Sequence, residues 1–170
     1  MTSRARLVVS ITLMAAAALL LLACGSAATT RDAFPTEIAG QTMSYSTARG
    51  DQLPNSDYPG WLVEVANHFP GGLAATTVYR GYLQDQFEYK SDIIEVRGAT
   101  SDQLLRVVLD VSGLADNRRT DQIDGKAVVR GVPRGEEDLD HGFYFYGFDD
   151  AVIILVASDA RAREALRQLP

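Results

Sequence analysis

Few side chains in this sequence are of the types that carry out nucleophilic, acid–base or metal chemistry. The 170 residues include one cysteine, Cys24, and two histidines, His68 and His141. Imidazole is the usual general base near neutral pH and a common metal ligand. Such chemistry would therefore have to use His68 or His141. The sequence motifs of serine hydrolases, phosphate-binding loops, dinucleotide-binding folds, zinc peptidases and EF-hands are all absent.

Glu64 precedes His68 by four residues, so the two side chains share a face if this segment is helical. That arrangement could place a carboxylate beside an imidazole for general-base catalysis or metal binding. A second interpretation needs no ligand. A histidine in the last turn of a helix is favoured there by the helix dipole, and Glu64 would be an ordinary solvated residue one turn earlier.

The densest charged segment lies between Gly135 and Gly142, and it contains Glu136, Glu137, Asp138, Asp140 and His141. Oxygen-rich loops can hold calcium, and Asp140 with His141 could join a transition-metal site. The spacing matches no calcium-binding loop, and a charged hairpin loop explains the same residues with nothing bound. We therefore assign no metal ligands, no cofactor and no catalytic residues.

An aromatic run follows, formed by Phe143, Tyr144, Phe145, Tyr146 and Phe148. On a strand, successive side chains point to opposite faces. If no helix covers the face of Tyr144 and Tyr146, these two residues form an exposed aromatic strip suited to a ligand or a partner protein. They are the candidate binding residues, although ordinary surface tyrosines would produce the same pattern.

Cys24 lies at the end of a leader. Arg4 and Arg6 precede an apolar segment from Leu7 to Ala23. A transmembrane helix needs about 20 apolar residues, and this segment is shorter. A basic start, a short apolar core and small residues before the cleavage site are typical of a secretory signal peptide. An uncleaved anchor helix and cleavage to a free protein are the alternatives.

The tetrapeptide Leu21-Leu22-Ala23-Cys24 resembles the lipobox of bacterial prolipoproteins. The resemblance implies cleavage between Ala23 and Cys24, thioether linkage of diacylglycerol to Cys24, and acylation of the new amino group with a fatty acid such as palmitate. Two or three acyl chains hold a protein on a membrane stably, whereas one does so marginally. We expect a lipid-anchored cell-membrane protein that faces outside the cytoplasm.

Removal of residues 1–23 would leave 147 residues, the size of one ordinary domain. Loss of Arg4 and Arg6 changes the formal net charge from −6 to −8, which disfavours nucleic acid as a partner. With Cys24 acylated, no thiol remains for a disulfide. Residues 24–33 carry the lipid and a small, polar tether of at most about 30 Å, and residues 34–170 form the single extracytoplasmic domain.

Three amphipathic helices are predicted from their caps and apolar stripes. The first begins at Asp57 or Pro59 and ends at Pro70-Gly71-Gly72; the second begins at Thr100, in a capping box with Gln103, and ends at Gly113; the third begins at Ser158 or Asp159 and includes Leu169. Each helix must pack against a sheet or another helix.

Strands are predicted at residues 38–46, 75–82, within 87–98, and at 126–132, 143–146 and 151–157, because these segments are rich in β-branched and aromatic residues. The last segment is apolar on both faces, which favours a central, fully covered strand. In the third, the apolar alternation changes phase at Ile94, which predicts a bulge or a break near residues 91–93.

An internal similarity links residues 37–43 with residues 122–128. Both contain Ile, any residue, Gly and a long polar residue, at an offset of 85. The match favours two similar β-β-β-α halves, residues 34–113 and 119–170, joined through residues 115–121. An Ile-x-Gly strand start is also common without any duplication.

Four segments resemble uncharacterised secreted or lipid-anchored proteins of actinobacteria and related bacteria. They are residues 34–40, residues 123–129, the hairpin from 144–146 to 152–154, and residues 165–170. The resemblance covers most of the mature chain and implies its fold. That group has no assigned activity, so it assigns no functional residue.

We therefore expect an α+β domain: a largely antiparallel sheet with about three helices packed on one face. Its predicted role is to bind an envelope protein or a small ligand without catalysis. The alternative is a small surface hydrolase or metal-dependent enzyme that uses His68 or His141 with Glu64, Asp138 or Asp140. A third option is a passive envelope component. Convergence of both histidines on one pocket would favour the enzyme.

Overall fold

The computed structural model describes residues 34–55, 58–83, 89–114, 116–132 and 141–169, with the backbone alone for residue 116. These residues belong to one compact unit, Ala33–Pro170. In chain order its elements are β1 (Glu37–Ile38), β2 (Gln41–Thr42), β3 (Ser44–Arg49), the 3₁₀ helix η2 (Gly50–Asn55), α2 (Trp61–Asn67), the 3₁₀ helix η3 (Gly72–Ala75), β4 (Thr76–Tyr82), β5 (Tyr89–Val96), α3 (Ser101–Ser112), β6 (Asp116–Ile123), β7 (Lys126–Val132), β8 (His141–Phe148), β9 (Ala151–Ser158) and α4 (Asp159–Gln168). The predicted leader, Cys24 and the tether lie outside the described residues.

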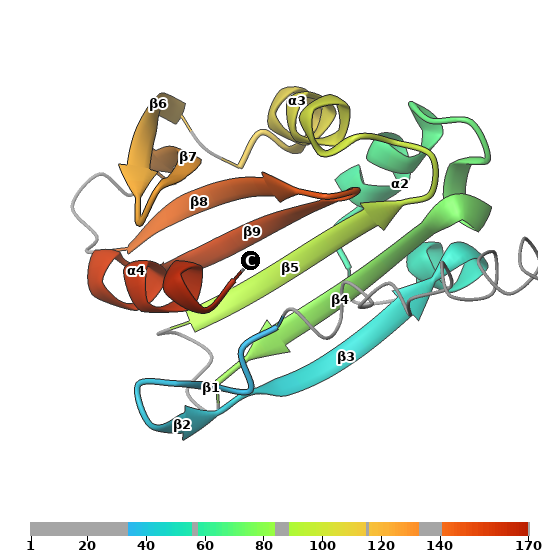
Figure 1. Cartoon of the computed structure of the whole chain (residues 1–170). Helices are drawn as coiled ribbons and strands as arrows, with labels where there is room; N and C mark the ends of the chain where they lie inside the picture. The colour runs from blue at the N-terminus through green and yellow to red at the C-terminus, as the bar shows by residue number, and fades with distance from the viewer. Residues whose placement is uncertain (1–33, 56–57, 84–88, 115, 133–140, 170) are drawn as a thin grey trace, which may run out of the picture. The chain divides into compact units, whose positions relative to one another are not determined.

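Seven strands form one antiparallel sheet in the order β3-β4-β5-β9-β8-β7-β6, and β1 and β2 form a separate hairpin (Figure 1). The strand predicted to be central, β9, lies between β5 and β8. Its side chains are buried along almost its whole length. The sheet is therefore built around the most apolar segment of the domain, as burial of apolar surface requires.

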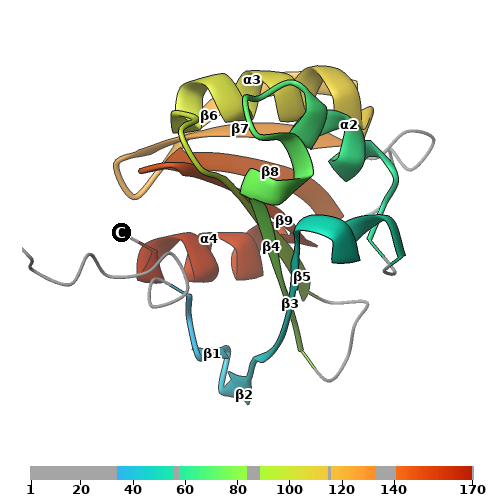
Figure 2. The same cartoon turned by 90° about the vertical axis from the view of Figure 1, so that its right-hand side faces the viewer.

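The three described α-helices cover both faces of the sheet (Figure 2). Ile153 of β9 packs in one core cluster with Leu166 of α4, whereas the neighbouring Ile154 packs in a second cluster with Leu62 of α2 and Leu104 of α3. The predicted α+β class is confirmed: an antiparallel sheet with three helices packed against it. The placement of all three helices on one face was wrong, because a strand that is apolar on both sides must be covered on both sides.

The same two-sided burial explains β5. Its pairing with β4 and with β9 continues without interruption from Tyr89 to Glu95, so the predicted bulge is not present. Ile93 joins the cluster under α4 and Ile94 joins the cluster under α2 and α3, and neither is exposed. The change of phase in the sequence reflects burial on both faces.

The segment predicted to join two halves is instead an edge strand, β6, which pairs with β7 and has a register irregularity between Asp116 and Arg119. The sequence of β6 is polar, so it shows no apolar alternation that would predict a strand. An edge strand with one exposed face can form through its backbone hydrogen bonds while its side chains remain polar.

The predicted capping box at the start of α3 is confirmed. The backbone N–H of Gln103 donates to Thr100 Oγ1 at 3.4 Å, and the backbone N–H of Thr100 donates to Gln103 Oε1 at 3.2 Å. Gly113 ends the helix with a φ of 56°. Both ends of α3 are therefore set by local sequence.

The two similar segments each form a two-residue hairpin turn. Ala39 and Gly40 join β1 to β2 with φ of 51° and 74°, and Asp124 and Gly125 join β6 to β7 with φ of 50° and 80°. Positive φ at both central residues is the geometry of a type I′ turn. The order β3-β4-β5-α3 recurs as β7-β8-β9-α4, with α3 and α4 on opposite faces of the sheet.

Candidate ligand-binding site

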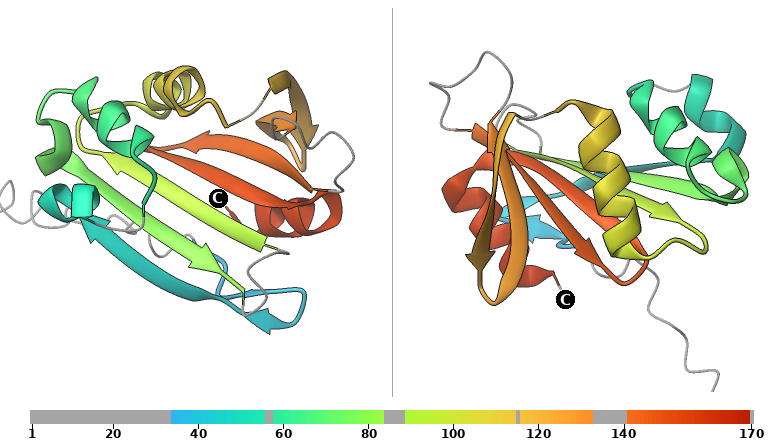
Figure 3. Two further views of the ribbon diagram at one scale, coloured as in Figure 1. Left: turned by 180° about the vertical axis from the view of Figure 1, so that it is seen from behind. Right: turned by 90° about the horizontal axis from the view of Figure 1, so that it is seen from above.

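The two histidines belong to distant elements. His68 follows α2, is exposed like Glu64, and its backbone N–H donates to the carbonyl of Val65 at 3.1 Å. His141 is the first residue of β8 and is paired with Ser158 of β9. Helix α2 and the start of β8 lie at opposite ends of the sheet (Figures 1 and 3). The histidines therefore do not converge on one pocket.

The carboxylates of the acidic loop, including Asp138 and Asp140, lie outside the described residues. Within the part of the chain that the structure describes, no three His, Cys, Asp or Glu side chains form a group that could hold a metal ion.

The predicted aromatic strip is not an exposed surface. Tyr144 is 1% exposed and packs in the core cluster that includes α4. Its hydroxyl donates to the carboxylate of Asp159, the first residue of α4, and Arg130 Nη2 lies 2.5 Å from the same carboxylate. Burial, then the hydrogen bond to Asp159, raise the pKa of Tyr144 above the ordinary value for tyrosine. Tyr146 is half-buried and stacks on Phe148 at 6.1 Å.

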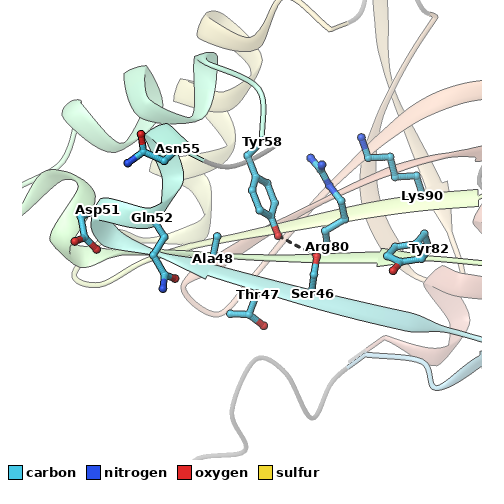
Figure 4. Close-up of a pocket in the computed structure, with 10 residues that line it drawn as sticks. All are labelled: Ser46, Thr47, Ala48, Asp51, Gln52, Asn55, Tyr58, Arg80, Tyr82 and Lys90. Atoms are coloured by element: carbon cyan, nitrogen blue, oxygen red, sulfur yellow. Dashed lines mark hydrogen bonds between the residues drawn. The ribbon is translucent and has the colours of Figure 1, made fainter.

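The structure is hollowed on the opposite face of the sheet, over strands β3, β4 and β5 (Figure 4). This hollow has a volume of about 950 Å³, and we call it the β3–β5 hollow. It is lined by Ser46, Thr47 and Ala48 of β3, by Asp51, Gln52 and Asn55 of η2, by Tyr58, by Arg80 and Tyr82 of β4, and by Lys90 of β5.

Strand register explains why the hollow is polar. Three rows cross β3, β4 and β5 on this face: Ala48, Val78 and Ile94; then Ser46, Arg80 and Asp92; then Ser44, Tyr82 and Lys90. The first row is buried in the cluster with α2 and α3. The side chains of the next two rows point to the same face because side-chain direction repeats every second residue. The face thus changes from apolar to polar along the strands.

An ion pair lies at the floor of the hollow. Arg80 Nε is 2.6 Å from Asp92 Oδ1, and Arg80 Nη2 is 3.1 Å from Oδ2, so the contact is bidentate. The two side chains are 15% and 10% exposed. Lys90 Nζ lies 3.9 Å from Asp92 Oδ2 and its side chain is 39% exposed. Bidentate pairing fixes the orientation of the guanidinium plane.

Tyr58 holds the same guanidinium from the side. The Arg80 carbon Cζ lies 4.3 Å from the centre of the Tyr58 ring, within the range of a cation–π contact. The Tyr58 hydroxyl is 3.3 Å from Ser46 Oγ (Figure 4). Tyr58 is thereby linked to the edge strand β3. The Arg80 guanidinium lies between Tyr58 and Asp92.

The hollow contains side chains that bind polar molecules: hydroxyls, amides, carboxylates and cations. None of its residues was a candidate from sequence. The signal that could have found them is the recurrence of polar or charged side chains at alternate positions of otherwise apolar strands, Arg80 and Tyr82 in β4 and Lys90 and Asp92 in β5. Their meeting across two strands depends on register, which sequence pattern did not supply.

No protein-family model, curated protein or solved structure was found that matches the chain. The resemblance to lipid-anchored actinobacterial proteins stays a prediction. Among the described helices, none is both long enough and apolar enough to cross a membrane.

Proposed function

We propose that this chain is a membrane-tethered extracytoplasmic lipoprotein, anchored through acyl chains on Cys24, whose α+β domain binds a ligand or an envelope protein in the β3–β5 hollow. The observation that carries the proposal is the nearly buried Arg80–Asp92 pair at the floor of that hollow. Burying two charges costs hydration energy that their attraction seldom repays, so such a pair adds little to stability. We therefore assign the pair to binding rather than to stability.

The position of Phe34, the first described residue, supports this arrangement. The ring of Phe34 lies 5.0 Å from that of Tyr45 and 5.8 Å from that of Tyr79. These tyrosines are on the α4 face of the sheet, whereas the next residues along their strands, Ser46 and Arg80, are on the face of the hollow. Phe34 therefore begins the described domain on the α4 face, and the hollow lies on the other face of the sheet.

Charge supports an anchor that depends on acyl chains. The mature domain has a formal net charge of −8, so anionic lipid headgroups repel it. The enzymatic alternative required a histidine with converging carboxylates. The described residues Glu64, His68 and His141 do not meet in the β3–β5 hollow. Binding therefore remains the function that the described geometry supports best.

Photo-crosslinking in the native membrane tests the proposal. A benzophenone amino acid replaces Tyr82, which is half-buried in the hollow, and in a matched control it replaces Tyr146, which is half-buried on the α4 face. We expect irradiation to give a crosslinked product, either a protein or a small-molecule mass shift, from the Tyr82 position alone. Equal products from both positions, or none from Tyr82, would contradict the proposal.

A further inference from the structure

The charges at the described part of the β3–β5 hollow are balanced. The Arg80 guanidinium is neutralised by Asp92, which lies beneath it and outside the lining, and the lining itself adds one positive charge from Lys90 and one negative charge from Asp51. The other polar groups are neutral: the hydroxyls of Ser46, Thr47, Tyr58 and Tyr82 and the amides of Gln52 and Asn55. An anionic ligand would meet the Asp51 carboxylate, and a cationic ligand would meet the Lys90 ammonium.

The lining also disfavours an apolar ligand. Ala48 is the one aliphatic side chain among the described lining residues, and it is buried. Apart from the rings of Tyr58 and Tyr82, an apolar side chain would therefore find no apolar subsite in the described lining. A hydroxyl-rich ligand fits better, because each hydroxyl can donate to a carboxylate or amide oxygen and accept from an ammonium or amide nitrogen.

We propose that the β3–β5 hollow binds a neutral oligosaccharide. This inference rests on the proposed function and names its ligand class. The volume of about 950 Å³ is near the upper end of small-ligand sites, which are roughly 300–1,000 Å³, so the hollow suits several sugar units better than one.

Two side chains have geometries suited to direct contact with the sugar. Lys90 Nζ is 3.9 Å from Asp92, beyond the hydrogen-bond limit of about 3.2 Å, so this exposed ammonium can donate to ligand hydroxyls. Tyr82 is directly opposite Lys90 in the strand register and half-buried. Its ring offers a flat apolar surface for the C–H face of a sugar ring. Arg80 contacts Asp92 and Tyr58, and we assign it a structural role at the base of the hollow.

The chain contains two lysines, which makes a test on the unaltered protein simple. Lys90 is in the hollow, and Lys126 is at the start of β7, next to the other edge of the sheet. The full-length protein in detergent is acetylated with a limiting amine-reactive reagent, and modification of both lysines is followed by mass spectrometry. The probes are maltotetraose, cellotetraose, tetra-N-acetylchitotetraose and, as an anion, inorganic phosphate.

We expect at least one tetrasaccharide, at about 10 mM, to slow acetylation of Lys90 about twofold or more and to leave Lys126 unchanged; a Kd near 1 mM would give nearly full occupancy. Protection of Lys90 by phosphate alone, or protection by none of the probes, would overturn the saccharide assignment. Binding should also change little between about 0.05 and about 0.5 M NaCl, because a neutral ligand is not subject to charge screening. A steep loss of binding with salt would count against it.

Variants then locate the contact by calorimetric titration with the protecting sugar. Tyr82→Ala should weaken binding about tenfold, as loss of a ring contact does. Lys90→Gln should weaken it several-fold, while Lys126→Gln should bind like the unaltered protein. Equal affinity of all three variants would overturn the site.

The two proposals fail separately. A crosslinked protein from the Tyr82 position with no saccharide protection of Lys90 would leave the hollow as a binding site and remove the saccharide. Absence of both signals would remove the hollow as a binding site altogether.

Discussion

Arg80 and Asp92 are twelve residues apart in the sequence and directly opposite each other in the antiparallel pairing of β4 with β5. Neither would be buried without the other, because an unpaired charge at this depth would be much more costly than the pair. The same carboxylate also lies near Lys90. Asp92 thus lies close to both cations of the hollow. Its effect on stability can be measured separately from its effect on binding.

Asp92→Ala should lower the free energy of unfolding by about 3 kcal/mol, because it leaves Arg80 nearly buried without its carboxylate. The double variant Arg80→Met with Asp92→Leu should lie within about 1 kcal/mol of the unaltered protein, since it removes both charges. Urea unfolding followed by circular dichroism measures both values. If the double variant loses as much stability as Asp92→Ala, an unpaired charge is not the cause of the loss.

Tyr144 shows that a tyrosine on an alternating strand need not be exposed: it was a candidate surface residue and is buried. Its alternation with Phe143 and Phe145 correctly placed the side chains on two faces of a strand. The hydroxyl finds its partner, Asp159, only because α4 folds back over that face after β9. The contact joins residues 15 positions apart in the sequence, and no local pattern in residues 143–148 predicts it.

At the scale of elements, local signals decided the ends of helices and turns. The capping box at Thr100, the left-handed Gly113 and the two turns with Gly40 and Gly125 all depend on a few adjacent residues. Such features are readable because their energies come from backbone conformations that few residue types adopt easily. The internal similarity is a pair of these turns.

Gly125→Ala tests the turn between β6 and β7. A Cβ at this position would meet no atom within 4 Å, but φ is +80°, so the cost is backbone strain of about 1 kcal/mol. Gly60→Ala is the matched control, because Gly60 also has open space around it and has a φ of −58°. Thermal unfolding should show a lower Tm for Gly125→Ala and little change for Gly60→Ala. An equal decrease in both would mean that strain is not the cause.

At the scale of the whole molecule, the first described residue and the hollow lie on opposite faces of the sheet. Phe34 packs on the α4 face, and the hollow opens on the face of α2. Under the proposed lipidation, the position of the domain in the envelope depends on the acyl chains and the tether, because the acidic surface gains nothing from the lipid headgroups.

Cys24→Ala should therefore abolish membrane attachment. Cells are fed an alkyne fatty acid, and the membrane fraction is examined for labelled protein. We expect the label on the unaltered protein and none on the variant, because Cys24 is the one thiol of the sequence and the proposed thioether site. Lys126→Gln, which changes a residue of β7, serves as a control that should be labelled normally. Equal labelling of Cys24→Ala would refute the lipobox assignment.

The sequence by itself determined several elements of this protein: the capped helix at Thr100, the strand 151–157 with apolar residues on both faces, and the α+β class. These depend on interactions between residues close in the chain, or on an apolar pattern that must be buried. The predicted strand 38–46 was wrong, because Ala39 and Gly40 form a turn within it. Only the tertiary structure decided that α4 lies opposite α2 and α3, that Tyr144 is covered, and that Arg80, Asp92 and Lys90 meet beside Tyr58. These outcomes depend on strand register and on which face each helix covers, and both are set by the packing of the whole core.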